Sequence, residues 1–224
     1  MKHTKIGSAK KARRGIVGIE AAIVLIAFVV VAAALAFVAL NMGFYTTQRS
    51  KEVMAAGLAQ ASSSLEVDGS VLAEVNTSSN KLTCIAIPIR LSAGQKPVDL
   101  TPNKTQIALW VINKDAFTNL YTKDSQAVRN PVSSYDISSL CGTAGNSNGI
   151  AIIWAPGSNG DTVLDAGEKA IVVVSFGNLG SNKITGGLDP YDIVKVEIKP
   201  PMGAALTVER TVPASLTNSV LDLG

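Results

Sequence analysis

The sequence predicts an α+β protein in which a long N-terminal hydrophobic α-helix is followed by an immunoglobulin-like antiparallel β-sandwich. Two observations carry this prediction. The residues from Ala21 to Leu40 are uncharged and apolar, and helical spacing continues beyond them to about residue 64. From Leu65 onward, short apolar segments alternate with turn residues, which is typical of antiparallel strands. A chain of 224 residues is long enough for one such helix and one domain with its own core.

The first segment, residues 16–64, is expected to form one helix about 70 Å long at the standard rise per residue. Its first half is apolar on every side, so lipid or other protein must surround it. The 20 residues from Ala21 to Leu40 match the hydrocarbon thickness of a bilayer, which predicts that the precursor crosses the membrane. Alanines at 32, 33, 34, 36 and 39 allow close helix packing. Since this surface would aggregate in water, the pattern favours a head-to-tail filament of identical helices.

The first 15 residues contain six lysines and arginines and no acid, which holds this end on the cytoplasmic side of a membrane. An ordinary secretory signal is cut after its apolar core at a small-residue site, and no such site follows Leu40. The candidate cleavage therefore precedes the apolar segment, between Gly15 and Ile16. Removal of residues 1–15 would change the formal net charge from +3 to −3, leaving no basic character that favours nucleic acid.

Glu20 is the acidic residue at the start of the apolar segment, where an unpaired carboxylate is costly. Cleavage before Ile16 would create an ammonium group one helical turn away. Glu20 can then neutralise the amine of its own subunit or of a neighbour and set the axial register. The alternative is that Glu20 lies at the level of the lipid headgroups and simply reaches water.

Residues 65–224 are expected to form the outer β-sandwich. Leu82–Leu91 is apolar nearly throughout, which predicts a central strand that ends or bulges at Pro88. Trp110 and Trp154 fall in predicted strands and are interpreted as core or interface residues. Residues 113–149 are expected to form an irregular insertion on the outer surface. The seven predicted strands are Leu65–Val75, Leu82–Leu91, Gln106–Ile112, Ile150–Ala155, Ala170–Phe176, Ile193–Lys199 and Ala205–Val212.

Histidine-based catalytic motifs are absent from the sequence; a pair of catalytic carboxylates stays open, but nothing in the sequence points to a cleft. The single histidine, His3, lies in the segment that we expect to be removed, so no Ser–His–Asp set, Cys–His set or histidine-based metal site can form. The glycine-rich stretch around Gly177 and Gly180 lacks the spacing of a phosphate-binding loop. The chain is therefore predicted not to be an enzyme and to require no cofactor.

The sharpest polar cluster runs from Asn159 to Glu168. Oxygens of Asp161, Asp165 and Glu168 form a candidate Ca²⁺ site, because Ca²⁺ takes six to eight oxygen ligands. The spacing is not that of an EF-hand. The alternative is a tight acidic turn whose side chains accept hydrogen bonds from backbone amides.

Covalent modification is expected at two kinds of site. Cys84 and Cys141 can form one disulfide in an exported chain, worth about 4 kcal/mol by the chain-entropy model; the alternative is two separate buried thiols. The sequons at Asn76 and Asn103 lie in polar stretches beside strands and are candidate N-glycosylation sites.

Several motifs together carry a family resemblance. A basic end, a glycine and a following apolar helix with a glutamate at its fifth position resemble the class III signal peptides of type IV pilin-like subunits. The segments Gly18–Ala22, Asn41–Gln48, Leu65–Ala73, Leu188–Asp192 and Ile198–Ala204 are similar to those of archaeal flagellins (archaellins), closest to the crenarchaeal type. The likeness covers the N-terminal third and the last quarter of the chain.

The resemblance implies a structural subunit of the archaeal flagellar filament, which self-assembles through its N-terminal helix for swimming motility. It also implies a prepilin-type signal peptidase that cuts after Gly15, a precursor in the cytoplasmic membrane, the archaellum assembly machinery as partner and an extracellular filament. Two alternatives stay open. One is an adhesive type IV-like pilus subunit, which an aromatic or basic patch on the outer domain would favour, and no such patch is evident in the sequence. The other is a single-pass membrane-anchored surface binding domain.

Overall fold

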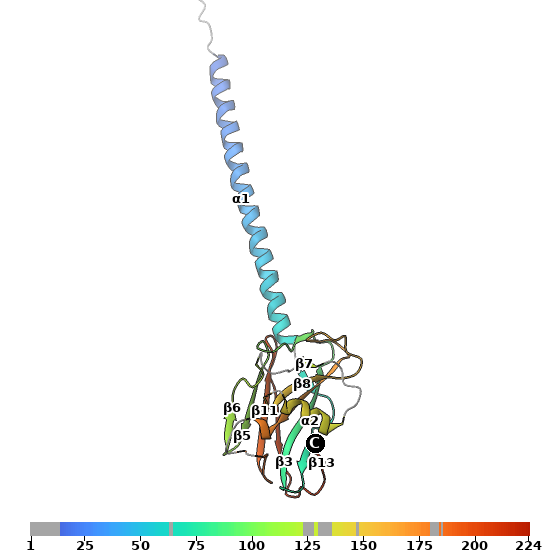
Figure 1. Cartoon of the computed structure of the whole chain (residues 1–224). Coiled ribbons are helices and arrows are strands. Elements are labelled where there is room, and N and C mark those ends of the chain that lie inside the picture. The colour runs from blue at the N-terminus through green and yellow to red at the C-terminus, as the bar shows by residue number, and fades with distance from the viewer. Residues whose placement is uncertain are drawn as a thin grey trace, which may run out of the picture. The chain divides into compact units, whose positions relative to one another are not determined.

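The computed structural model describes residues 14–62, 65–122, 128–129, 136–146, 148–179, 184 and 186–224. Contacts divide the chain into two compact units at Ala55, and each unit is considered by itself. Helix α1 extends from Arg14 to Ser62 as one uninterrupted helix of 49 residues (Figure 1). The described part of the first unit is this helix up to Ala55, and its last seven residues belong to the second unit. The predicted long N-terminal helix is confirmed, and residues 63 and 64, its expected end, lie outside the described residues.

The second unit contains two sheets that are antiparallel except for the parallel pairing of β7 with β8, which confirms the predicted fold class. In the first sheet the strands follow the order β13-β2-β3-β10-β8-β7, and β1 also pairs with β3. In the second sheet the order is β12-β11-β5-β6, and β4 and β9 form a separate pair. The strands are β1 Leu65–Val67, β2 Leu72–Asn76, β3 Lys81–Leu91, β4 Val98–Asp99, β5 Gln106–Val111, β6 Asp115–Phe117, β7 Val128–Arg129, β8 Ile150–Trp154, β9 Val163–Leu164, β10 Lys169–Ser175, β11 Ile193–Lys199, β12 Leu206–Thr211 and β13 Val220–Asp222.

The main core lies between the two sheets. Ile87 of β3 and Val172 of β10 contribute to it from the first sheet, and Leu109 of β5 and Val196 of β11 contribute from the second. Burial alternates along β5 and β11, so the second sheet has one buried face and one face toward solvent. All five residues of β8 and six of the seven in β10 are buried, so the first sheet is covered on both faces.

The second cover is a short helix that the sequence did not predict. Residues 113–149, expected as an irregular insertion, include α2 from Ile137 to Gly145 and the short strands β6 and β7. Helix α2 buries Ile137, Leu140, Cys141 and Ala144 against the outer face of the first sheet. Its sequence, ISSLCGTAG, contains serine, threonine and glycine, which have weak helix propensity, so tertiary packing decides this helix.

Pro88 neither ends nor bulges β3, which corrects the expectation from sequence. Its carbonyl oxygen accepts a hydrogen bond from the backbone amide of Asp68 at 2.9 Å, so its nitrogen also faces that edge of the strand. On that edge β1 pairs as far as Ile89 and β2 begins at Leu72 opposite Ala86. The missing N–H therefore falls at the break between β1 and β2. The same break divides the single strand expected over residues 65–75.

Ion pairs around Asp189 connect the two sheets at one end. Lys114 lies in the turn between β5 and β6. Its Nζ is 2.6 Å from Asp189 Oδ2 and 2.5 Å from Asp192 Oδ2. Lys81 Nζ, at the start of β3, lies 3.1 Å from Asp189 Oδ1. Hydrogen bonds from Lys114 and Lys81 lower the pKa of Asp189, and burial only partly opposes them. Burial alone would lower the pKa of Lys114, but the two aspartates raise it above its usual value.

Removal of the disulfide tests how α2 is attached. The pair Cys84 and Cys141 closes a loop with a sequence separation of 57, so the double substitution Cys84→Ala/Cys141→Ala should cost about 4 kcal/mol. Calorimetry of the full chain in detergent should show the β-domain unfolding about 10 °C lower, with faster amide exchange at residues 137–145. Ser138→Ala, which keeps the disulfide, is the matched control. An unchanged unfolding midpoint in the double variant would show that the disulfide does not stabilise the attachment of α2.

Candidate functional site

The apolar surface of α1 is the largest candidate functional site. All described side chains from Gly18 to Leu58 are exposed, and this is the one described helix long and apolar enough to cross a membrane. Nineteen of the 24 exposed large hydrophobic side chains in the described chain lie on it. Burial of one such side chain is worth about 1.5–3 kcal/mol, so covering the helix would release on the order of 30 kcal/mol per subunit. A surface of this kind favours lipid or other copies of itself over water.

The N-terminal site residues lie at the start of this helix. Gly15, Ile16 and Glu20 all fall within α1, whose first described residue is Arg14. Glu20 is exposed. Since Ile16 and Glu20 are four residues apart, they lie on the same side of the helix, one turn from each other. An amine created at Ile16 would therefore be within the reach of the Glu20 carboxylate of the same chain.

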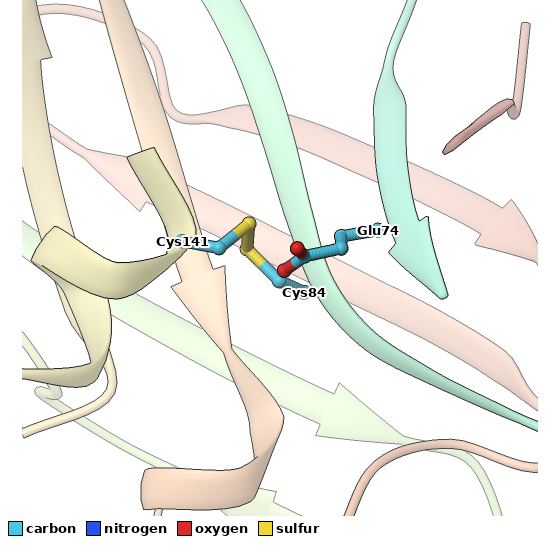
Figure 2. A group of neighbouring side chains, drawn as sticks. All are labelled: Glu74, Cys84 and Cys141. Atoms are coloured by element: carbon cyan, nitrogen blue, oxygen red, sulfur yellow. A yellow bond between two sulfur atoms is a disulfide. The ribbon is translucent and has the colours of Figure 1, made fainter. Parts of the chain in front are cut away.

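The disulfide site is formed by β3 and α2. Cys84 and Cys141 are bonded to each other with a Cα–Cα distance of 5.9 Å. Figure 2 shows the Glu74 side chain from β2 directed toward the two sulfurs, and one of its oxygens lies within 4.8 Å of both. Ser138 Oγ donates a hydrogen bond to Glu74 Oε1 at 2.6 Å. Because each sulfur is bonded to the other, neither is the thiolate that a metal ligand must be.

The acidic residues of the 159–168 segment act as hydrogen-bond acceptors within the turn. The side-chain amide of Asn159 donates to Asp161 and to Asp165, at 3.1 Å in each case. Glu168 accepts from the backbone amides of Asn159 and Asp165, at 2.7 and 3.1 Å. Asp161 also accepts from the amide of Val163 at 2.8 Å. Asp161 and Asp165 thus accept hydrogen bonds from the same Asn159 amide, and a cation bound between the two carboxylates would have to displace this amide.

The two sequons differ in the accessibility of the hydroxyl that completes them. Asn76 is exposed as the last residue of β2, and its Oδ1 accepts a hydrogen bond from the amide of Ser78 at 3.0 Å in the turn that follows. Asn103 is exposed as well, but Thr105 is 0% exposed and its hydroxyl donates to the Asp99 carbonyl at 2.7 Å. The folded domain therefore presents the complete sequon at Asn76 and only part of it at Asn103.

A recess on the solvent face of the second sheet was missed by sequence reasoning. Trp110 is partly exposed there, whereas Trp154 is buried in the core. The alternation of β5 was the available signal, because Trp110 lies out of phase with the buried Leu109 and Val111. The Trp110 recess has a volume of ≈ 680 Å³, and its lining includes Trp110, Ile112, Lys114, Ala116, Lys195 and Glu197.

Comparisons with known proteins agree with these features. The model of the archaeal-type flagellin family matches residues 15–210. The chain is 46% identical over 216 residues to probable flagellin 1 of Aeropyrum pernix, covering 95% of this chain and 98% of that protein. It is 39% identical over 226 residues to probable flagellin 2 of Archaeoglobus fulgidus, covering 96% and 98% of the two chains.

Two solved structures are similar as well. The archaeal flagellum of Methanospirillum hungatei strain JF1 matches with a TM-score of 0.61 and 26% identity, covering 91% of this chain and 98% of that one. The crystal structure of archaeal flagellin FlaB1 from Methanocaldococcus jannaschii matches in fold with a TM-score of 0.58 and 20% identity, covering 72% and 96%. The resemblance inferred from the sequence motifs is thereby confirmed: the chain belongs to the archaeal-type flagellin family.

Proposed function

We propose that this chain is the structural subunit of an archaeal flagellar filament on the cell surface. The observation that carries the proposal is the fully exposed apolar face of α1 in a member of the flagellin family. Flagellins are structural proteins, so the chain is a self-assembling filament subunit and not an enzyme. The family match favours this function over an adhesive pilus subunit or an anchored surface domain. In swimming, the filament would transmit rotation from a motor formed by other proteins.

Assembly would proceed in three steps. A prepilin-type signal peptidase in the membrane would remove residues 1–15 after Gly15. The helix, residues 16–64, would then leave the lipid with the help of the archaellum assembly machinery and enter a bundle of identical helices. Residues 65–224 would form the outer sheath. The lipid and the helix bundle both keep the apolar surface of the helix out of water, so the transfer from one to the other would not lose the free energy of apolar burial.

Glu20 would fix the register within this bundle. An ammonium group at Ile16 and a carboxylate at Glu20 are both costly in an apolar core unless they neutralise each other. The four-residue spacing permits pairing within one chain, and close helix packing permits pairing between chains. Either pair restricts where neighbouring helices can stop along the filament axis.

Calcium binding by Asp161, Asp165 and Glu168 is a separate proposal for the outer domain. Its support is the convergence of two carboxylates on one position, now occupied by the Asn159 amide. The backbone hydrogen bonds favour the acidic-turn interpretation, and filament assembly does not depend on the ion. For glycosylation, the exposed sequon at Asn76 is the better acceptor, because the hydroxyl of the Asn103 sequon is buried.

The first test is the N-terminus of the protein sheared from cells. Mass spectrometry should find a chain that starts at Ile16, in a sedimentable fraction that electron microscopy shows to be filamentous. Gly15→Val should abolish the cleavage and leave the uncut chain in the membrane. A chain that starts at Met1 and remains in the membrane fraction in the unmodified protein would contradict the filament proposal.

The second test concerns Glu20. Glu20→Ala should leave cleavage intact and reduce filament formation by an order of magnitude or more, because an unpaired ammonium group costs several kcal/mol in an apolar core. Filaments are counted by electron microscopy after cleavage has been verified by mass. Glu52→Ala, on the same helix, removes an exposed acid paired with Arg49 and should assemble normally. Normal filaments from Glu20→Ala would refute the register role.

The third test separates the two sequons. The intact mass of the filament protein should fall to that of the bare chain in Asn76→Gln and stay unchanged in Asn103→Gln. Both substitutions keep an amide side chain at an exposed position, so each is the control for the other. Loss of the glycan in Asn103→Gln alone would show that modification precedes the burial of Thr105.

A further inference from the structure

We propose that the Trp110 recess of one subunit receives the tip of the β11–β12 hairpin of the next subunit. The second sheet would then form a head-to-tail contact between outer domains in the filament. This inference rests on the proposed function, because the occupant is a second copy of the chain. Beyond the proposed function, it names the two surfaces of neighbouring outer domains that would contact each other.

The hairpin tip is a rigid apolar projection. It comprises residues 200–205, between the end of β11 and the start of β12. Pro200 is buried and Pro201 follows it, so two consecutive φ angles are fixed. Gly203 completes the turn with a φ of 104°. Met202 is 54% exposed at this tip. Because the prolines restrict the backbone, little backbone entropy would be lost when a partner covers the tip.

The recess has the composition of an interface hot spot. The small side chain of Ala116 lies opposite Trp110 on β6, which leaves that side of the indole accessible. Ile112 is 42% exposed at its edge. Trp110 is the aromatic side chain in the lining, and aromatic residues in a pocket are typical of binding surfaces.

The two features lie toward opposite ends of one sheet. In the pairing of β11 with β5, Lys195 is opposite Trp110, whereas Lys199, the last residue before the tip, is opposite Gln106. A helical filament requires two different, mutually complementary patches on each subunit, since a contact between identical patches closes into a dimer. A projection toward one end of the sheet and a recess toward the other satisfy this requirement.

The charges of the two features are also complementary. From Lys199 to Thr207 the hairpin carries one charge, the exposed Lys199. The recess is lined by Asp115, Glu197, Lys195 and Lys114. These four side chains have no formal net charge together, and Asp189 and Asp192 bind Lys114. Lys199 of an incoming hairpin would pair with Glu197 of the recess.

Disulfide trapping tests the contact in assembled filaments. The variant Ala116→Cys/Met202→Cys places thiols in the recess and on the tip, at two exposed positions. Mild oxidation should produce a ladder of covalent multimers on a non-reducing denaturing gel. Ala93→Cys/Met202→Cys, with the first thiol in an exposed loop elsewhere, should produce none. Filaments without a ladder, or with cross-linked monomers only, would overturn the inference.

Single-cysteine and charge-swap variants sharpen the result. Dimers from Ala116→Cys alone or Met202→Cys alone would indicate contact between identical patches and overturn the head-to-tail arrangement. Glu197→Lys should lower the yield of the ladder about fivefold, and adding Lys199→Glu should restore it. Absence of filaments from the unmodified chain would instead count against the proposed function, so the two failures are distinguishable.

Discussion

The structure depends on one constraint, namely that the apolar surface of α1 cannot remain in water. Every described side chain from Gly18 to Leu58 is exposed, and nothing within the described chain covers them. The free energy at stake, on the order of 30 kcal/mol, exceeds the stability of an ordinary domain. The helix is therefore stable only in a membrane or among other copies, and in the proposed assembly it would occupy these two environments in turn.

The outer domain differs from the helix because it must be stable by itself in an extracellular setting. Its first sheet is buried on both faces, by the second sheet on one side and by α2 on the other. Helix α2 has a weakly helical sequence, and the bond between Cys84 and Cys141 ties it to β3. The ion pairs of Lys114 and Lys81 with Asp189 hold the ends of the two sheets together. The disulfide thus attaches α2 to the first sheet, and the ion pairs attach the ends of the two sheets to each other.

Much of this arrangement could be predicted from the sequence, and the failures have physical causes. The long helix and the seven main strands follow from apolar periodicity, which is strong where one or both faces are buried. Helix α2 was missed because its residues favour loops, and tertiary packing overrides that preference. The five unpredicted strands β4, β6, β7, β9 and β13 have only two or three residues each, which is too short for a recognisable pattern. Pro88 misled because its missing N–H faces a break in the neighbouring strand, which no local pattern reveals. The Trp110 recess was missed because an exposed tryptophan and a buried one look alike until the phase of the strand is known.

A filament needs specificity as well as cohesion, and the two come from different parts of the chain. Burial of α1 is strong but non-directional, since valine, leucine and alanine surfaces pack nearly as well after a shift along the axis. Register must then come from groups that tolerate few positions. A carboxylate that needs an amine at Glu20 is one such group. The rigid hairpin tip between β11 and β12, which would fit one recess, is another. Its residues come near the C-terminal end of the sequence, whereas Glu20 lies near the N-terminal end. Two directional contacts, one in the core and one in the sheath, would restrict both translation and rotation of each subunit, which cohesion by the helix alone cannot do.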